Sequence, residues 1–65
     1  EVLAENLKRH RLATGLSQEE LAHRADIDRT YVSSLERCQY SATVDMIEKL
    51  ARVLGVEAAE LLRQP

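Results

Sequence analysis

The sequence predicts an all-α protein, a compact bundle of five short helices. Apolar residues recur at the spacing that places them along one side of a helix, and capping residues and glycines divide the chain into helix-sized segments. No run of β-branched and aromatic residues alternates with polar ones, so no strand is expected. The chain has 65 residues, which is enough for a single domain, 1–65.

The first helix is expected from about Val2 to Ala13. Leu3, Leu7, His10 and Thr14 fall on one line along this helix. Arg11 lies on the flank of this line. Gly15 is the expected C-terminal stop, because glycine adopts a left-handed backbone conformation at little cost.

The second helix is expected to begin after Ser17. Ser17 and Glu20 have the spacing of a capping box, in which the serine oxygen accepts a bond from an early backbone N–H and the glutamate reaches back. The inward face consists of Leu21, Ala22 and Ala25. Asp26 and Ile27 then form a tight turn.

The third helix, from Asp28 to Arg37, has little apolar surface. Asp28 is its expected N-cap. Val32 and Leu35 point inward, with Tyr31 at their edge. The outward face holds Arg29, Thr30, Ser33, Ser34 and Arg37. This helix is therefore half core and half presentation surface.

Two further helices complete the predicted bundle. Residues 37–42 form a loop, and Thr43 caps a fourth helix that ends at Gly55. The inward face of the fourth helix consists of Ile47, Leu50, Ala51 and Leu54. A short fifth helix within residues 56–62 ends in Leu61 and Leu62, which either belong to the core or face a partner subunit.

Composition limits the classes of function. The net charge of −2 does not by itself indicate nucleic-acid binding, because such domains are often strongly basic. Cys38 is the single cysteine, which excludes an internal disulfide and fits a reducing cytoplasm. His10 and His23 do not have metal-ligand spacing, and no apolar run approaches the ~20 residues of a membrane span. We therefore expect a cytoplasmic protein without a secretion signal, membrane contact, metal, cofactor or small-molecule ligand.

Catalysis is not expected from this sequence. It has no nucleophile with a base at useful spacing, no paired carboxylates in an evident pocket and no glycine-rich phosphate loop. The protein is predicted not to be an enzyme.

The second and third helices together suggest a helix-turn-helix motif. In that motif the second of the two helices enters the DNA major groove and its N-terminal residues reach base edges. Arg29 can donate two hydrogen bonds to guanine, and Thr30 can meet thymine or another base edge. Ser33 and Ser34 are small enough to let the backbone approach the groove.

The stretch GLSQEELAHRADIDRTYVSSLER, residues 15–37, resembles the Cro and lambda-repressor-like helix-turn-helix regulators, also called XRE-like. The stretch IEKLARVLGVEAAELL, residues 47–62, resembles their two closing helices. Within the family, DRTYVSSLER is most similar to controller proteins of restriction–modification systems. The resemblance covers nearly the whole chain and implies a transcriptional regulator that binds double-stranded DNA.

The resemblance also implies roles for single positions. Gln18 matches a position that contacts a DNA phosphate, and Lys8 and Arg11 lie near positions used on the DNA backbone or in the fold. Arg11 and Glu36 match a pair that forms a buried ion pair between the first and third helices. The positions that match base-facing residues are Arg29, Thr30, Ser33 and Ser34.

Four other residues have alternative roles. Tyr31 either belongs partly to the core or stacks on the sugar-phosphate backbone. Arg37 either contacts a phosphate or pairs with a nearby carboxylate. Gln39 and Tyr40 follow the third helix, where they either touch the DNA backbone or are plain loop residues.

Three positions depart from the family pattern. Asp26 and Cys38 stand where glycine is common, and His10 stands where an apolar residue is common. Aspartate tolerates a left-handed conformation better than most residues do. Cysteine would be strained there, so the loop after the third helix is expected to follow another path.

A homodimer is expected, because two copies related by a two-fold axis read a palindromic operator. The fourth and fifth helices are the expected dimer surface, since the first three are committed to core and DNA. The alternative is a protein-interaction module, antitoxin-like or partner-binding, with little DNA binding of its own. The acidic balance favours this alternative, and the small, polar outer face of the third helix disfavours it.

Overall fold

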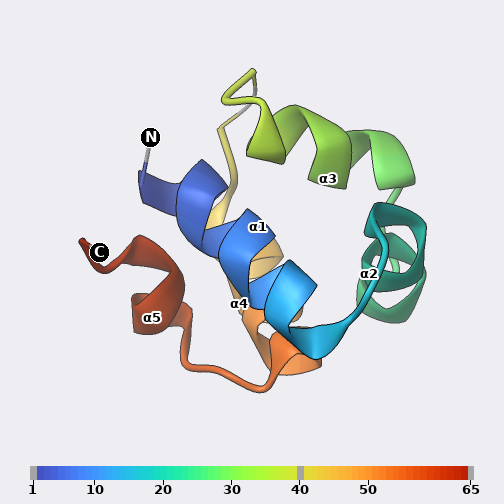
Figure 1. Cartoon of the computed structure of the whole chain (residues 1–65). Helices are drawn as coiled ribbons and strands as arrows, with labels where there is room; N and C mark the ends of the chain where they lie inside the picture. Colours follow the sequence, from blue (N-terminus) through green and yellow to red (C-terminus); the bar gives the residue numbers. More distant parts are fainter. Residues whose placement is uncertain (1, 40, 65) are drawn as a thin grey trace.

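The computed structural model describes residues 2–39 and 41–64, and this part of the chain forms an all-α bundle. The helices are α1 (Val2–Thr14), α2 (Gln18–Ala25), α3 (Arg29–Glu36), α4 (Val44–Leu54) and α5 (Ala58–Leu62). Figure 1 shows α1 between α3 and α5, with α4 behind it and α2 beside the end of α1. The predicted fold class and the order of five helices are confirmed.

One shared apolar core holds the bundle together. Its fully buried members come from every helix and include Leu7, Leu21, Val32, Leu35, Leu50 and Leu61. The faces predicted to point inward in α2, α3 and α4 are all buried. Along the line predicted in α1, Leu3 and Leu7 are buried and His10 is half-buried, whereas Thr14, the last residue of the helix, is exposed.

Two of the three predicted helix caps are made by side chains. Ser17 accepts a bond from the Glu20 N–H at 3.0 Å, and Thr43 accepts one from the Met46 N–H at 3.1 Å. The Glu20 carboxylate lies 3.4 Å from Arg24, so it is directed along α2 rather than back to Ser17. Asp28 occupies the N-cap position of α3, but its side chain makes no capping hydrogen bond.

Residues with a left-handed backbone directly follow α1, α2 and α4, at the positions that the sequence predicted. Gly15 and Gly55 have φ angles of 79° and 74°, directly after α1 and α4. Asp26 has a φ of 60° in the turn between α2 and α3. The N–H of the next residue, Ile27, donates to the Ala22 carbonyl at 2.9 Å, which closes the turn.

The prediction for the loop after α3 is wrong. Cys38 has a φ of 60°, so this loop keeps the left-handed turn that glycine favours instead of following another path. The Cys38 and Gln39 N–H groups donate to the Leu35 and Ser34 carbonyls at 3.2 and 2.9 Å. These bonds satisfy the last carbonyl groups of α3, and they are the physical reason that the strained conformation is retained.

A polar clamp fixes α5 against α1. The Asn6 side chain is buried in α1, and its Nδ2 donates to the Leu61 and Arg63 carbonyls at 2.9 and 2.7 Å. Arg9 donates to the Asn6 Oδ1 at 2.9 Å. Leu61 is consequently core, whereas Leu62 is 54% exposed.

The described helices are all too short or too polar to cross a membrane.

Candidate nucleic-acid interface

The outer face of α3 carries the residues that are predicted to contact DNA bases. Val32 and Leu35 are fully buried and attach the helix to the body. Arg29 and Thr30, in the first turn, are exposed, and Ser33 and Ser34 are half-buried. The structure therefore brings all four residues predicted for base contact onto one helix, with the largest exposure at its N-terminal end.

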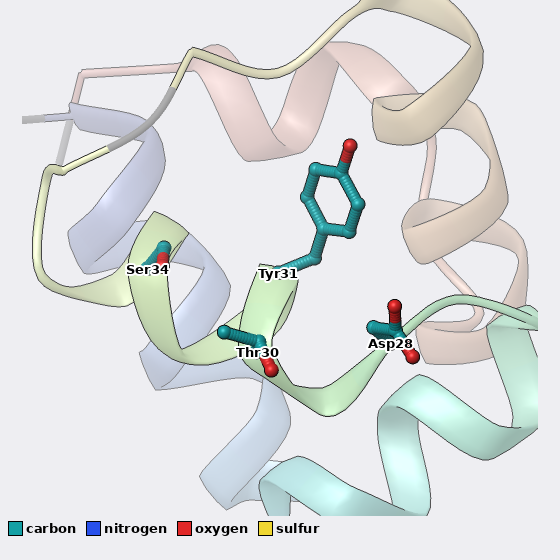
Figure 2. Close-up of a pocket in the computed structure, with 4 residues that line it drawn as sticks. All are labelled: Asp28, Thr30, Tyr31 and Ser34. Atoms are coloured by element: carbon teal, nitrogen blue, oxygen red, sulfur yellow. The ribbon is translucent and has the colours of Figure 1, made fainter.

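A shallow hollow of about 180 Å³ lies along this helix and is lined by Asp28, Thr30, Tyr31 and Ser34. Figure 2 shows Tyr31 projecting from α3, with Asp28 just before the helix and Ser34 one turn farther along. Sequence reasoning treated Asp28 only as a helix cap and missed its place in this hollow. Its position next to Arg29 at the start of the polar face was the available signal.

The predicted ion pair between α1 and α3 is present. The Arg11 Nε donates to Glu36 Oε2 at 2.7 Å, and Arg11 Nη2 donates to Oε1 at 3.1 Å. The two side chains are only 10% and 4% exposed. The hydrogen bond and charge of Glu36 raise the pKa of the Arg11 guanidinium, and burial opposes this rise.

Arg11 serves the fold rather than a phosphate contact, because it is buried and each of its three guanidinium nitrogens donates a hydrogen bond inside the protein. Besides its two bonds to Glu36, its Nη1 donates to the Leu16 carbonyl at 2.9 Å. This third bond ties the loop between α1 and α2 to the ion pair. The resemblance left two roles open for Arg11, on the DNA backbone or in the fold, and these bonds favour the role in the fold.

Gln18 is partly engaged inside the protein. It is the first residue of α2, it is half-buried, and its Nε2 donates to Glu36 Oε1 at 3.0 Å. The family resemblance implied a phosphate contact for Gln18, and it did not indicate the bond to Glu36. Spacing along the chain could not reveal this bond, because the two residues lie on different helices.

The other residues predicted for backbone contact lie in α1, in α3 and directly after α3. Lys8, Arg37 and Gln39 are exposed, and Tyr31 is half-buried beside the hollow, which is compatible with both roles considered for it. Tyr40 lies outside the described residues.

The two histidines and the cysteine belong to three different segments of the chain. His10 is half-buried in α1, with a buried Nε2 that has no hydrogen-bond partner among the described residues, and His23 is exposed on α2. Cys38 is an exposed free thiol. Within residues 2–39 and 41–64, no three His, Cys, Asp or Glu side chains are grouped so that they could hold a metal ion.

Comparison with known proteins decides the family. A family model described as helix-turn-helix matches residues 7–61. The chain belongs to the helix-turn-helix family. The resemblance predicted from residues 15–37 is thereby confirmed, and the chain carries a helix-turn-helix domain similar to those of transcription regulators.

Two similar proteins illustrate the range of the family. The chain is 48% identical over 64 residues to a hypothetical transcription factor of Neisseria meningitidis, which covers 98% of this chain and 60% of that protein. It is 43% identical over 49 residues to control protein C.BamHI of Bacillus amyloliquefaciens, which covers 75% of this chain and 60% of that protein. The chain thus matches 60% of the length of each of these relatives.

Solved structures agree with the fold. The crystal structure of the Neisseria factor has a TM-score of 0.95 at 48% identity, covering 98% of this chain and 74% of that one. SinR, a master regulator for biofilm formation solved in complex with DNA, has a TM-score of 0.89 at 34% identity, covering 94% of this chain and 98% of that one. The lambda-repressor-like architecture expected from the sequence is therefore confirmed.

Proposed function

We propose that this domain is a cytoplasmic, non-catalytic regulator that reads specific sequences of double-stranded DNA through α3 in the major groove. The observation that carries the proposal is the polar outer face of α3, on which Arg29 and Thr30 are exposed in the first turn. Arg29 would donate two bonds to guanine O6 and N7, and Thr30 would contact a thymine methyl or another base edge. Ser33 and Ser34 would allow close approach and add hydroxyl contacts.

Contacts to the DNA backbone would set the orientation of α3. The proposed set consists of Lys8, Gln18, Tyr31, Arg37 and Gln39. Three of these side chains, Lys8, Arg37 and Gln39, are exposed. The net charge of −2 is compatible with this role, since Glu57 and Glu60 belong to the α5 end of the bundle, across α1 from α3 (Figure 1).

The proposed operator is palindromic and the proposed active form is a homodimer. The domain measures 26 × 23 × 20 Å, whereas palindromic half-sites are about 34 Å apart, so one copy is too small to read both. Val44 in α4 is 71% exposed and Leu62 in α5 is 54% exposed. These apolar side chains lie on the two helices that the sequence assigned to the dimer surface, and burying them in a dimer would stabilise it.

A salt-titrated binding assay with random duplex DNA, followed by selection of bound sequences, tests the proposal. The variant is Arg29→Ala with Thr30→Ala. The control is Arg63→Ala, which removes the same charge from the end of α5. We expect the normal chain and the control to enrich a palindrome, and the double variant to keep weak, salt-sensitive binding without sequence preference.

The salt dependence makes the test quantitative. Of the side chains proposed to contact DNA, three in each copy are cations, Lys8, Arg29 and Arg37. A dimer could therefore neutralise at most about six phosphates, and its slope would be no steeper than about −5. A slope near zero would exclude phosphate contact. Absence of DNA binding at low salt would overturn the proposal and favour the alternative role as a protein-interaction module.

A further inference from the structure

Glu36 connects three parts of the fold that lie far apart in the sequence. Its Oε1 accepts bonds from Gln18 Nε2 at 3.0 Å and from Arg11 Nη2 at 3.1 Å, and its Oε2 accepts from Arg11 Nε at 2.7 Å. The Glu36 side chain is only 4% exposed. Its carboxylate is therefore a fixed acceptor beside the first residue of α2.

This acceptor determines how the Gln18 amide is oriented. A glutamine amide has two N–H donors on its nitrogen and an acceptor oxygen on the other side. If the Gln18 amide were turned over, its oxygen would face the Glu36 carboxylate and two acceptors would oppose each other. With the nitrogen beside Glu36, one N–H is used and the second remains on the same atom for another acceptor.

The charge of Glu36 does not oppose DNA binding, because Arg11 balances it. A bare carboxylate near a phosphate group would repel it. The two hydrogen bonds from the Arg11 fork place a positive charge against Glu36. Arg11 also bonds the Leu16 carbonyl at 2.9 Å, which holds the guanidinium in place.

We propose that Glu36 is a positioning residue for DNA binding: neutralised by Arg11, it holds the Gln18 amide so that the second N–H of Nε2 is left for a phosphate of double-stranded DNA. This inference rests on the proposed DNA binding and gives Gln18 a specific mechanism within it. Arg11 acts on the DNA only through Glu36 and Gln18.

Nuclear magnetic resonance of the Gln18 side-chain amide tests the proposal on the unmodified protein. The probe is a random-sequence duplex about 20 base pairs long, long enough for two half-sites. In the free protein we expect one of the two Nε2 protons to be shifted downfield by its bond to Glu36. On addition of DNA, that proton keeps its position and the other moves downfield. The proposal is overturned if the bonded proton loses its shift, or if neither proton responds.

The DNA affinity of a set of variants tests whether the contribution of Gln18 depends on Glu36. Gln18→Ala is made in the normal chain and in a background with Arg11→Met and Glu36→Leu. Replacing both partners of a buried ion pair by apolar residues usually preserves the fold, whereas removing one leaves a buried charge. We expect Gln18→Ala to weaken binding to random duplex about 3- to 10-fold in the normal chain, and less than about 2-fold in the paired background.

Lys8→Ala is the matched control, because Lys8 is exposed and takes no part in the hydrogen bonds that join Arg11, Glu36 and Gln18. It should weaken binding equally in both backgrounds. Equal losses for Gln18→Ala in both backgrounds would overturn the positioning role, as would no loss in the normal chain. Failure of the normal chain to bind duplex DNA would instead overturn the proposed function itself, so the two failures are distinguishable.

Discussion

At Cys38 the backbone adopts a φ of 60°, in which the Cβ atom of an L residue is crowded against the following carbonyl group. Glycine has no Cβ and avoids this cost, although it gains entropy in the unfolded chain. We expect Cys38→Gly to raise the free energy of unfolding by about 0.5–1 kcal/mol. Urea denaturation measures this change directly.

Gly55→Ala provides the opposite comparison. Gly55 has a φ of 74°, and a Cβ added there would meet nothing within 4 Å. We expect Gly55→Ala to lower the free energy of unfolding by about 1 kcal/mol. Because the added Cβ meets no other atom, this loss reports the cost of the left-handed backbone conformation. If Cys38→Gly also destabilised the chain, the strain assigned to Cys38 would be wrong.

Asn6 is the residue whose removal should most affect α5. It is buried and its amide donates to the carbonyls of Leu61 and Arg63. We expect Asn6→Ala to lower the free energy of unfolding by about 1–3 kcal/mol, because the buried carbonyl of Leu61 and the part-buried carbonyl of Arg63 lose their donor. Hydrogen exchange in α5 should accelerate as well. Glu5→Ala, at the neighbouring exposed position, should stay within about 0.5 kcal/mol, and equal effects at both positions would contradict the clamp.

At the scale of the helices, the three N-caps should differ in energy. Ser17 and Thr43 make capping bonds of 3.0 and 3.1 Å, whereas Asp28 makes none with its side chain. We expect Ser17→Ala and Thr43→Ala each to cost about 1 kcal/mol. Asp28→Ala should cost about 0.5 kcal/mol or less, since only its charge near the N-terminus of α3 is lost. Thermal unfolding of the three variants checks the order, which would be reversed if Asp28 capped α3 in solution.

The α3 helix itself illustrates why its exposed face was predictable. Helical periodicity assigns Val32 and Leu35 to one side and the polar residues to the other, independently of what lies beneath. The burial of these two residues follows from that pattern. Which side chains line the adjacent hollow depends on how the chain enters α3, and the sequence did not reveal the place of Asp28 there.

At the scale of the whole molecule, the Arg11–Glu36 pair joins α1, α3 and the loop before α2. We expect Arg11→Met alone to lower the free energy of unfolding by about 3–5 kcal/mol, because Glu36 is left charged and buried. Adding Glu36→Leu should recover most of this loss. Urea denaturation of the single and paired variants measures both changes in the free energy of unfolding. If the paired variant were as unstable as Arg11→Met alone, the loss would come from packing and not from a buried charge.

The pH dependence of Arg11 follows from the direction of its shift. Glu36 raises the pKa of Arg11. The contribution of the Arg11–Glu36 interaction to the free energy of unfolding is therefore fully present below the ordinary pKa of arginine, and it is lost only as pH rises through the raised pKa. Arg11 itself therefore contributes no variation in stability near neutral pH.

The proposed dimer is tested by removing apolar surface from it. Leu62 is 54% exposed, and placing a charge there would be unfavourable in an apolar interface. We expect the normal chain to sediment as a dimer at high concentration, and Leu62→Asp to weaken self-association at least about 10-fold without loss of helicity. Leu12→Asp, on the exposed side of α1, is the control. A monomer at every concentration, with and without operator DNA, would exclude the homodimer.

The sequence by itself determined the helices, their glycine stops, the caps at Ser17 and Thr43, the polar face of α3 and the family, because periodicity, capping and turn chemistry are local properties of neighbouring residues. It also indicated the Arg11–Glu36 pair, through resemblance. Only the tertiary structure decided that Asn6 clamps α5, that Gln18 shares Glu36 with Arg11, and that Cys38 stays left-handed. Each of these outcomes depends on groups brought together by packing, or on hydrogen bonds that outweigh a local preference, and neither can be read from spacing along the chain.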